Sequence, residues 1–278
     1  MFRAAEKPAR PRVCPACGKL VGATATKCHE CGASLTFSLA AASRSVSGLL
    51  PSESPASYFI LGLNFFLFGV CLMASMQGGF SLFGSIRGEV LLRLGAKFMP
   101  AILEGEFWRL LLPIFLHGSF LHLAFNTIVL MDIGPTVEEV YGSARFFFLY
   151  LVTGIAGFLL SGWWSPYAIS IGASGSLMGL IGLMLAITTR RGGSYMRTLR
   201  SQLIRWVIYI FVLGLFFNAD HAAHLGGLAA GFLLGKVMTD REPVGAAERR
   251  RAYLLGWLAG LAVVASFAAM ILRYFRWL

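Results

Sequence analysis

The residues of this sequence that could do chemistry within an apolar segment are a serine and several histidines. Ser174 stands in the stretch SIGASGSLMG, where small residues crowd together as an apolar run begins. His224 stands in DHAAHLGG, and His122 and Asn126 stand in HGSFLHLAFN. A serine hydroxyl becomes a nucleophile when a histidine within hydrogen-bond reach can take its proton. Further donors at such a place could stabilise the oxyanion that forms when the serine attacks a carbonyl.

The elements that must position these residues are membrane spans. The chain has 278 residues, of which 57% are hydrophobic and 13% are charged, whereas a soluble protein carries about 25% charged residues. A spanning helix needs about 20 apolar residues. Seven runs are candidates: 57–77, 113–133, 144–163, 171–189, 203–219, 222–239 and 253–273. We therefore expect an all-α polytopic membrane protein.

The formal charge of +11 would favour a nucleic-acid partner if the protein were soluble. Here the basic residues lie in short segments between apolar runs, so they indicate topology and contact with anionic lipid, and we expect no nucleic-acid partner. The arginine-rich loops 190–200 and 239–252 and the basic N-terminus are placed in the cytoplasm by this rule. Seven spans then place the C-terminus outside. A structured external loop is expected at 78–112, and a bacterial plasma membrane is the expected location.

Under this topology the spans that carry the polar residues all run from outside to inside, and each polar group lies near the start of its span. The polar sites therefore fall at a similar depth, near the outer face. His122 and Asn126 share one helix face because they are four residues apart. His224 shares its face with Gly227, Gly231 and Gly235, and such a stripe lets two membrane helices approach closely. A close approach to the glycine-rich span after Ser174 would place His224 beside that serine.

Other interpretations of the same residues stay open at this point. Ser174 and the glycine stripes are also typical of plain helix packing. An external metal site, as in a transporter or a membrane metalloenzyme, could be built from His117, His122, Asp220, His221 and His224. However, the chain has no H-E-x-x-H motif, and the inner halves of the spans carry almost no ionisable groups. A third possibility is a membrane chaperone or adaptor without catalysis.

The N-terminal segment 1–35 is a small polar module with two C-x-x-C pairs, formed by Cys14, Cys17, Cys28 and Cys31, with ten residues between the pairs. Four thiolates are a complete ligand set for a structural Zn²⁺, so a zinc-ribbon-like module is expected. Two disulfides are the alternative, but these would need an oxidising compartment. The module is expected to be structural or to dock an unknown partner. Residues 36–56, rich in Ser, Ala and Pro, are expected to be a flexible linker.

Over about 57–240 the chain resembles the rhomboid intramembrane serine proteases. The resemblance depends on FWR (Trp108–Arg109), HGSFLHLAFN, GASG and AHLGGLAAG taken together. It implies a six-helix membrane core over 57–240, to which 241–278 adds a cytoplasmic loop and a seventh transmembrane helix. It also implies hydrolysis of a peptide bond in or near the transmembrane segment of a membrane-protein substrate.

Carried over by position, the resemblance makes Ser174 the nucleophile and His224 the general base, with no acidic third member and no catalytic cofactor. It places His122 and Asn126, with the Ser174 N–H, around the oxyanion hole, and Gly172 on the loop that shapes the hole. His117, Trp108 and Arg109 then look structural. The chain departs from the family at Met178, where the family often has an aromatic residue that stacks on the histidine.

Overall fold

The computed structural model describes residues 11–14, 17–23, 25–35, 53–75 and 85–275. Most of this part of the chain is helical. The long helices are α2 (Pro55–Ser75), α5 (Phe120–Tyr141), α6 (Ser143–Trp164), α7 (Ser174–Arg190), α8 (Ser194–Phe216), α9 (His221–Val237) and α10 (Ala246–Phe275). Among the described residues, five helices are long and apolar enough to cross a membrane: α2, α5, α6, α8 and α10. The prediction of an all-α polytopic membrane protein is confirmed.

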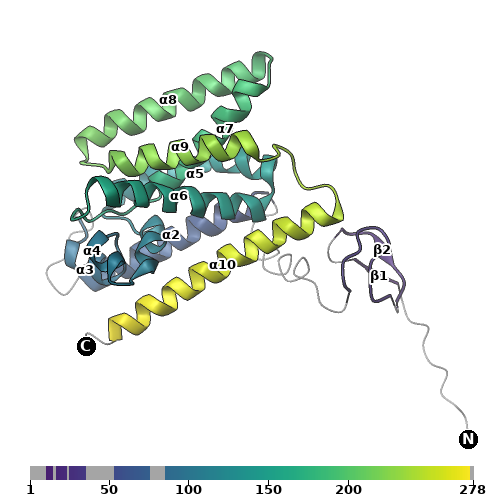
Figure 1. Cartoon of the computed structure of the whole chain (residues 1–278), viewed down its shortest axis with the longest axis horizontal. Coiled ribbons are helices and arrows are strands. Elements are labelled where there is room, and N and C mark those ends of the chain that lie inside the picture. The colour runs from purple at the N-terminus through teal and green to yellow at the C-terminus, as the bar shows by residue number, and fades with distance from the viewer. Residues whose placement is uncertain (1–10, 15–16, 24, 36–52, 76–84, 276–278) are drawn as a thin grey trace, which may run out of the picture.

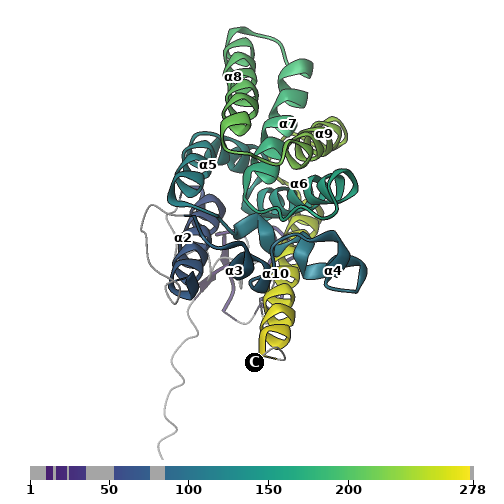
Figure 2. The same cartoon turned by 90° about the vertical axis from the view of Figure 1, so that its left-hand side faces the viewer.

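Helix α7 lies inside the bundle and packs against α5, α6, α8 and α9. Figure 2 looks at one end of the bundle and shows α7 among these helices, with α8 at one edge and α10 at the other. Helix α7 has only 17 residues, fewer than the roughly 20 that a span needs. Its neighbours cover 13 of those residues, so it is enclosed by protein. In Figure 1, α10 lies along α6 on the side away from α8.

Helices α7 and α9 pack closely against each other, and glycines form the contact. A Cβ atom added to Gly227 would lie 1.9 Å from the carbonyl oxygen of Gly175, and one added to Gly231 would lie 1.9 Å from that of Gly179. No residue larger than glycine fits at either position without moving a helix. The close approach predicted from the glycine stripe is therefore confirmed.

The predicted second span, 113–133, was wrong in its boundaries, because the helix there is α5, Phe120–Tyr141. The preceding residues form two 3₁₀ turns, η2 (Phe107–Leu110) and η3 (Leu112–Phe115), and the second contains Pro113. Ser119 then caps α5 by accepting a hydrogen bond from the His122 N–H at 3.2 Å. The turns of η3 are buried and apolar, so their sequence resembles the start of a span.

The predicted fifth span, 203–219, also differs from the structure. Helix α8 begins at Ser194, and the basic residues Arg197 and Arg200 belong to its first turns rather than to a loop. Helix α10 likewise begins earlier than the predicted 253–273, at Ala246. Hydropathy locates the apolar centre of such helices but not their polar ends.

The first loop is structured over its described residues, 85–112, as predicted. It contains α3 (Gly88–Arg93) and α4 (Met99–Leu103), followed by the 3₁₀ turns. The loop is therefore built from short helical turns rather than from extended chain.

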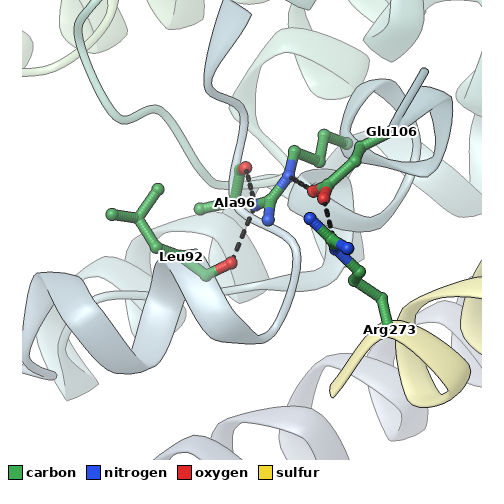
Figure 3. Close-up of polar contacts among 5 residues, drawn as sticks. Leu92, Ala96, Glu106 and Arg273 are labelled. Atoms are coloured by element: carbon green, nitrogen blue, oxygen red, sulfur yellow. Dashed lines mark hydrogen bonds and ion pairs between the residues drawn. The ribbon is translucent and has the colours of Figure 1, made fainter. Parts of the chain in front are cut away.

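Arg109 connects separate turns of this loop by hydrogen bonds. Its guanidinium donates to the carbonyl oxygens of Leu92 at 2.7 Å and Ala96 at 3.0 Å, and to the Glu106 carboxylate at 2.5 Å. Glu106 also accepts from Arg273 of α10 at 2.9 Å (Figure 3). The last helix is thus joined to the first loop by a charge-assisted hydrogen bond between Arg273 and Glu106.

The N-terminal module contains a short antiparallel hairpin, in which β1 (Arg12–Val13) pairs with β2 (Leu20–Val21). Its small core is made by Cys14, Val21 and Cys28, and Tyr253 near the start of α10 packs against it. Most of the expected linker, 36–52, lies outside the described residues.

Candidate active site and metal site

Ser174 and His224 are hydrogen-bonded to each other. The Nε2 atom of His224 lies 2.7 Å from the Oγ atom of Ser174. Ser174 is the first residue of α7, and His224 is the fourth residue of α9, where it is 3% exposed. The distance is short enough for direct proton transfer between hydroxyl and imidazole.

Asp220, which the sequence placed one turn before His224, is used as a helix cap. One carboxylate oxygen accepts a hydrogen bond from the Ala223 N–H at 2.9 Å, and the other accepts from the hydroxyl of Ser161 on α6. Asp220 therefore fixes the start of α9 and joins it to α6.

A cavity of about 370 Å³ opens in front of the serine, between α5 and α8. Five of the polar residues that the sequence singled out line it together, namely Ser174, His224, His122, Asn126 and Asp220, whereas His117 and His221 do not. The side toward α8 is largely apolar and includes Trp206, Ile210 and Leu213. The starts of α5, α7 and α9 therefore meet at one place, as the shared depth of their polar residues predicted.

His122 and Asn126 lie one turn apart on α5, and the Asn126 amide donates to the His122 carbonyl oxygen at 2.8 Å. Gly172, on the loop before Ser174, comes close to this histidine. A Cβ atom on Gly172 would lie 2.6 Å from Nε2 of His122, and the residue has a φ of +118°, which other residues rarely adopt. Glycine is needed there for both reasons.

His117 lies outside the cavity lining. Its side chain is fully buried, its Nδ1 atom is 3.3 Å from the carbonyl oxygen of Phe115, and its ring contacts that of His122 at 5.1 Å between centroids. Within the described residues, the histidines and Asp220 do not come together as a metal-ligand set. The alternative of an external metal site finds no support in this geometry.

Sequence reasoning missed Lys97, a buried residue of the first loop. Its ammonium donates to the carbonyl oxygens of Ser165 at 2.8 Å and Ala168 at 3.1 Å, and its backbone pairs with that of Ser170. Burial lowers the pKa of Lys97. The residue thus supports the segment that leads to Ser174. A single lysine in an otherwise apolar stretch, LGAKFMP, was the available signal.

The four cysteines of the N-terminal module form the only group in the described residues that could hold a metal ion. Their sulfur atoms all lie within 4.8 Å of one another, with Cys14–Cys31 at 3.7 Å and Cys17–Cys28 at 3.6 Å. A tetrahedral zinc site with Zn–S bonds of about 2.3 Å has S–S edges of about 3.8 Å. The arrangement fits Zn²⁺.

The thiols of this cluster differ in how readily they ionise. The Cys31 backbone N–H lowers the pKa of Cys28 to about 6, which favours the thiolate that a metal needs. Burial raises the pKa of Cys31 to about 12, so the thiolate of Cys31 depends on the positive charge of a bound metal.

Comparisons with known proteins identify the family to which this chain belongs. The family model for the rhomboid domain matches residues 104–241. The chain is 44% identical to the rhomboid protease GluP of Bacillus subtilis over 54% of this chain and 29% of GluP. It is 37% identical to RHOMBOID-like protein 5 of Arabidopsis thaliana over 63% of this chain and 60% of that protein. It is 30% identical to the mitochondrial RHOMBOID-like protein 6 of Arabidopsis thaliana over 67% of each.

The chain spans less than two thirds of the length of the first two relatives. The matched region nevertheless runs from the first loop to the end of α9 and contains both Ser174 and His224. The chain belongs to the rhomboid family.

Proposed function

We propose that the chain is an intramembrane serine endopeptidase with a Ser174–His224 dyad. The observation that carries this proposal is the 2.7 Å hydrogen bond between the two side chains, in a cavity of a multi-pass membrane protein. Relatives such as GluP are named rhomboid proteases, which supports the same reaction class.

In the proposed reaction, Ser174 Oγ attacks the substrate carbonyl carbon while His224 Nε2 takes the hydroxyl proton. The oxyanion accepts hydrogen bonds from the Ser174 N–H and from the side chains of His122 and Asn126. Because Ser174 starts α7, the positive end of that helix dipole also faces the developing charge. His224 then gives its proton to the leaving amine, and an acyl-enzyme remains. Water, deprotonated by His224, hydrolyses the acyl-enzyme.

The proposed substrate is the transmembrane segment of another membrane protein. The cavity lies between α5 and α8, and little of α8 is covered by the rest of the protein. A substrate helix must unwind locally to present its carbonyl, because in a helix that carbonyl is already hydrogen-bonded. Segments with Gly or Pro near a small residue at the cleaved bond are therefore the expected substrates.

The proposed orientation places the N-terminus and the basic loops in the cytoplasm of a bacterial plasma membrane. The C-terminus is then outside, and Ser174 opens toward the outer face. The N-terminal module, 1–35, would be a structural zinc domain on the cytoplasmic side that docks a partner. The membrane core would span 57–240, with 241–278 as the added loop and seventh helix.

The test is cleavage of a model transmembrane substrate by the full chain in liposomes. We expect activity in the wild type and in Ser176→Ala, whose serine lies two residues further along α7, against α6. Ser174→Ala and His224→Ala should be inactive, and a chelator should leave wild-type activity intact. Cleavage that persists in Ser174→Ala would overturn the dyad. Tight binding of several substrates without cleavage by the wild type would favour the adaptor function.

A further inference from the structure

We infer that Phe211 of α8 and His221 of α9 are positioning residues that hold the imidazole of His224 in its productive orientation. The inference rests on the proposed function, in which His224 is the general base. Phe211 and His221 lie on two different helices, and neither was singled out for this role by the sequence.

The three rings form one cluster. The rings of Phe211 and His221 are stacked, with centroids 5.5 Å apart and an angle of 9° between their planes. Each of these two rings meets the His224 ring at nearly a right angle, 85° for Phe211 and 84° for His221, with centroids 5.9 Å away in both cases. Edge-to-face contacts of this kind are favourable and depend on orientation. The His224 imidazole therefore has one ring nitrogen at Ser174, and the rings of Phe211 and His221 pack beside it.

Among the described residues, hydrogen bonding orients this imidazole at only one atom, so packing supplies the further constraint. The Nδ1 atom of His224 is buried and has no hydrogen-bond partner among the described residues. In a Ser-His-Asp triad a carboxylate at that atom fixes the ring and its tautomer. Here the neighbouring carboxylate, Asp220, caps α9 and binds Ser161 instead. The ring contacts remain as the constraint on rotation of His224.

The backbone of α8 makes room for this cluster. A Cβ atom on Gly214, three residues after Phe211, would lie 2.8 Å from Cε1 of His221. The glycine thus leaves space for the His221 imidazole, while Phe211 stacks on its face. Met178, at the position where the family often has an aromatic residue, is buried within α7. In this chain the aromatic contact with the base comes from α8 and α9.

The test uses the full chain in liposomes, with Phe211→Leu, Phe211→Tyr and, as a matched control, Phe216→Leu. Phe216 is an aromatic residue of the same helix that is 79% exposed. Three quantities are measured: kcat and KM for a model transmembrane substrate, the rate at which a fluorophosphonate modifies Ser174, and the thermal unfolding midpoint. In the modification the serine oxygen displaces fluoride from phosphorus while His224 takes the hydroxyl proton, so its rate reports on the base without a protein substrate.

For Phe211→Leu we expect kcat and the modification rate to fall roughly tenfold, with KM nearly unchanged. A misoriented base should lose only part of the rate enhancement of roughly 10²–10⁴-fold that general-base catalysis supplies. Phe211→Tyr, which keeps the ring, should stay close to the wild type, and so should Phe216→Leu. Wild-type kcat in Phe211→Leu, or an equal loss in Phe216→Leu, would overturn the inference.

A second pair of variants keeps the inference testable if Phe211→Leu does not fold. His221→Phe retains a ring beside His224 and should keep more activity than His221→Ala at equal thermal stability. Equal activity of these two variants would contradict a positioning role. If instead Ser174→Ala still cleaves, the proposed dyad itself fails, which is a separate outcome.

Discussion

Gly227 of α9 lies directly against the carbonyl oxygen of Gly175, the residue that follows Ser174. A Cβ atom at Gly227 would be 1.9 Å from that oxygen. His224 is three residues before Gly227 and therefore lies on the same face of α9. The separation of α7 and α9 thus sets the distance between the serine hydroxyl and the imidazole.

Replacing Gly227 with alanine should damage both stability and activity. The added methyl group must push α7 and α9 apart, and overpacking of this kind destabilises a core by about 1–3 kcal/mol. The hydrogen bond between Ser174 and His224 should lengthen, so cleavage should fall more than stability alone explains. Thermal unfolding in detergent and cleavage in liposomes measure the two effects. Gly62→Ala on α2 is the control because a Cβ atom there meets nothing within 4 Å; equal behaviour of the two variants would refute the role of this contact.

His122 and Asn126, the residues that we propose to stabilise the oxyanion, should affect kcat more than KM. Loss of one donor to an oxyanion typically lowers kcat by about 10²–10³-fold, because the bond forms fully only in the transition state. We expect such losses for His122→Ala and Asn126→Ala, measured by steady-state cleavage. Ile128→Ala, on the same helix but 54% exposed, should retain wild-type kcat. A change confined to KM in the first two variants would argue against oxyanion stabilisation.

The fold and the proximity of Ser174 and His224 were predictable because both depend on periodic patterns in the sequence. The glycine stripe of α9 and the spacing of His122 and Asn126 are local in sequence, and a membrane helix turns such spacing directly into a shared face. The start of α5 was not predictable, because buried 3₁₀ turns and a membrane span are equally apolar. The contact of Phe211 with His224 depends on how α8 packs against α9. No spacing within either helix encodes that packing.

Glu138 should be important for stability although it is remote from the serine. From α5 its carboxylate accepts hydrogen bonds from the backbone N–H groups of Ala56 and Ser57 at 2.9 and 2.8 Å, and from the Ser57 hydroxyl at 2.8 Å. It therefore caps the start of α2. Glu138→Ala leaves these donors buried without an acceptor, which should destabilise the fold by about 3 kcal/mol.

The measurement for Glu138 is the thermal unfolding midpoint, with cleavage per folded molecule as the second readout. Glu138 is 16 residues from His122, or about 24 Å along α5, so activity per folded molecule should be unchanged. The neighbouring Glu139→Ala is the control because its side chain is exposed. Equal midpoints for the two variants would contradict the capping role.

The four-cysteine cluster should hold one zinc ion per chain, whose removal unfolds the N-terminal module but spares cleavage. Structural zinc sites of this type contribute directly to folding of their module. Metal analysis of purified protein should give one Zn²⁺ in the wild type and in Cys71→Ser, whose cysteine lies in α2. Cys28→Ser should lose the metal. Deletion of residues 1–35 should leave cleavage of a generic substrate largely intact, and complete loss of cleavage would contradict a role limited to structure or partner docking.

Lys97 should stabilise the segment before Ser174, and its contribution should depend on pH. Its side chain is fully buried, and its ammonium donates to two carbonyl oxygens of that segment. Lys97→Met keeps a side chain of similar length but leaves these oxygens without their donor, so both the unfolding midpoint and kcat should fall. Lys19→Met is the control because Lys19 is exposed and lies in the N-terminal module.

The direction of the pH effect follows from the lowered pKa of Lys97, which burial causes. The folded chain releases the Lys97 proton at a lower pH than the unfolded chain, whose lysine has the ordinary value of 10.5. Between these two values the unfolded state binds more protons, so the free energy of unfolding gains a positive slope with pH from this residue. The stability of the wild type relative to Lys97→Met should therefore rise as the pH approaches 10.5 from below. Unfolding midpoints of both proteins across that range measure it, and a difference that stays constant or shrinks would show that Lys97 is not held in a desolvated site.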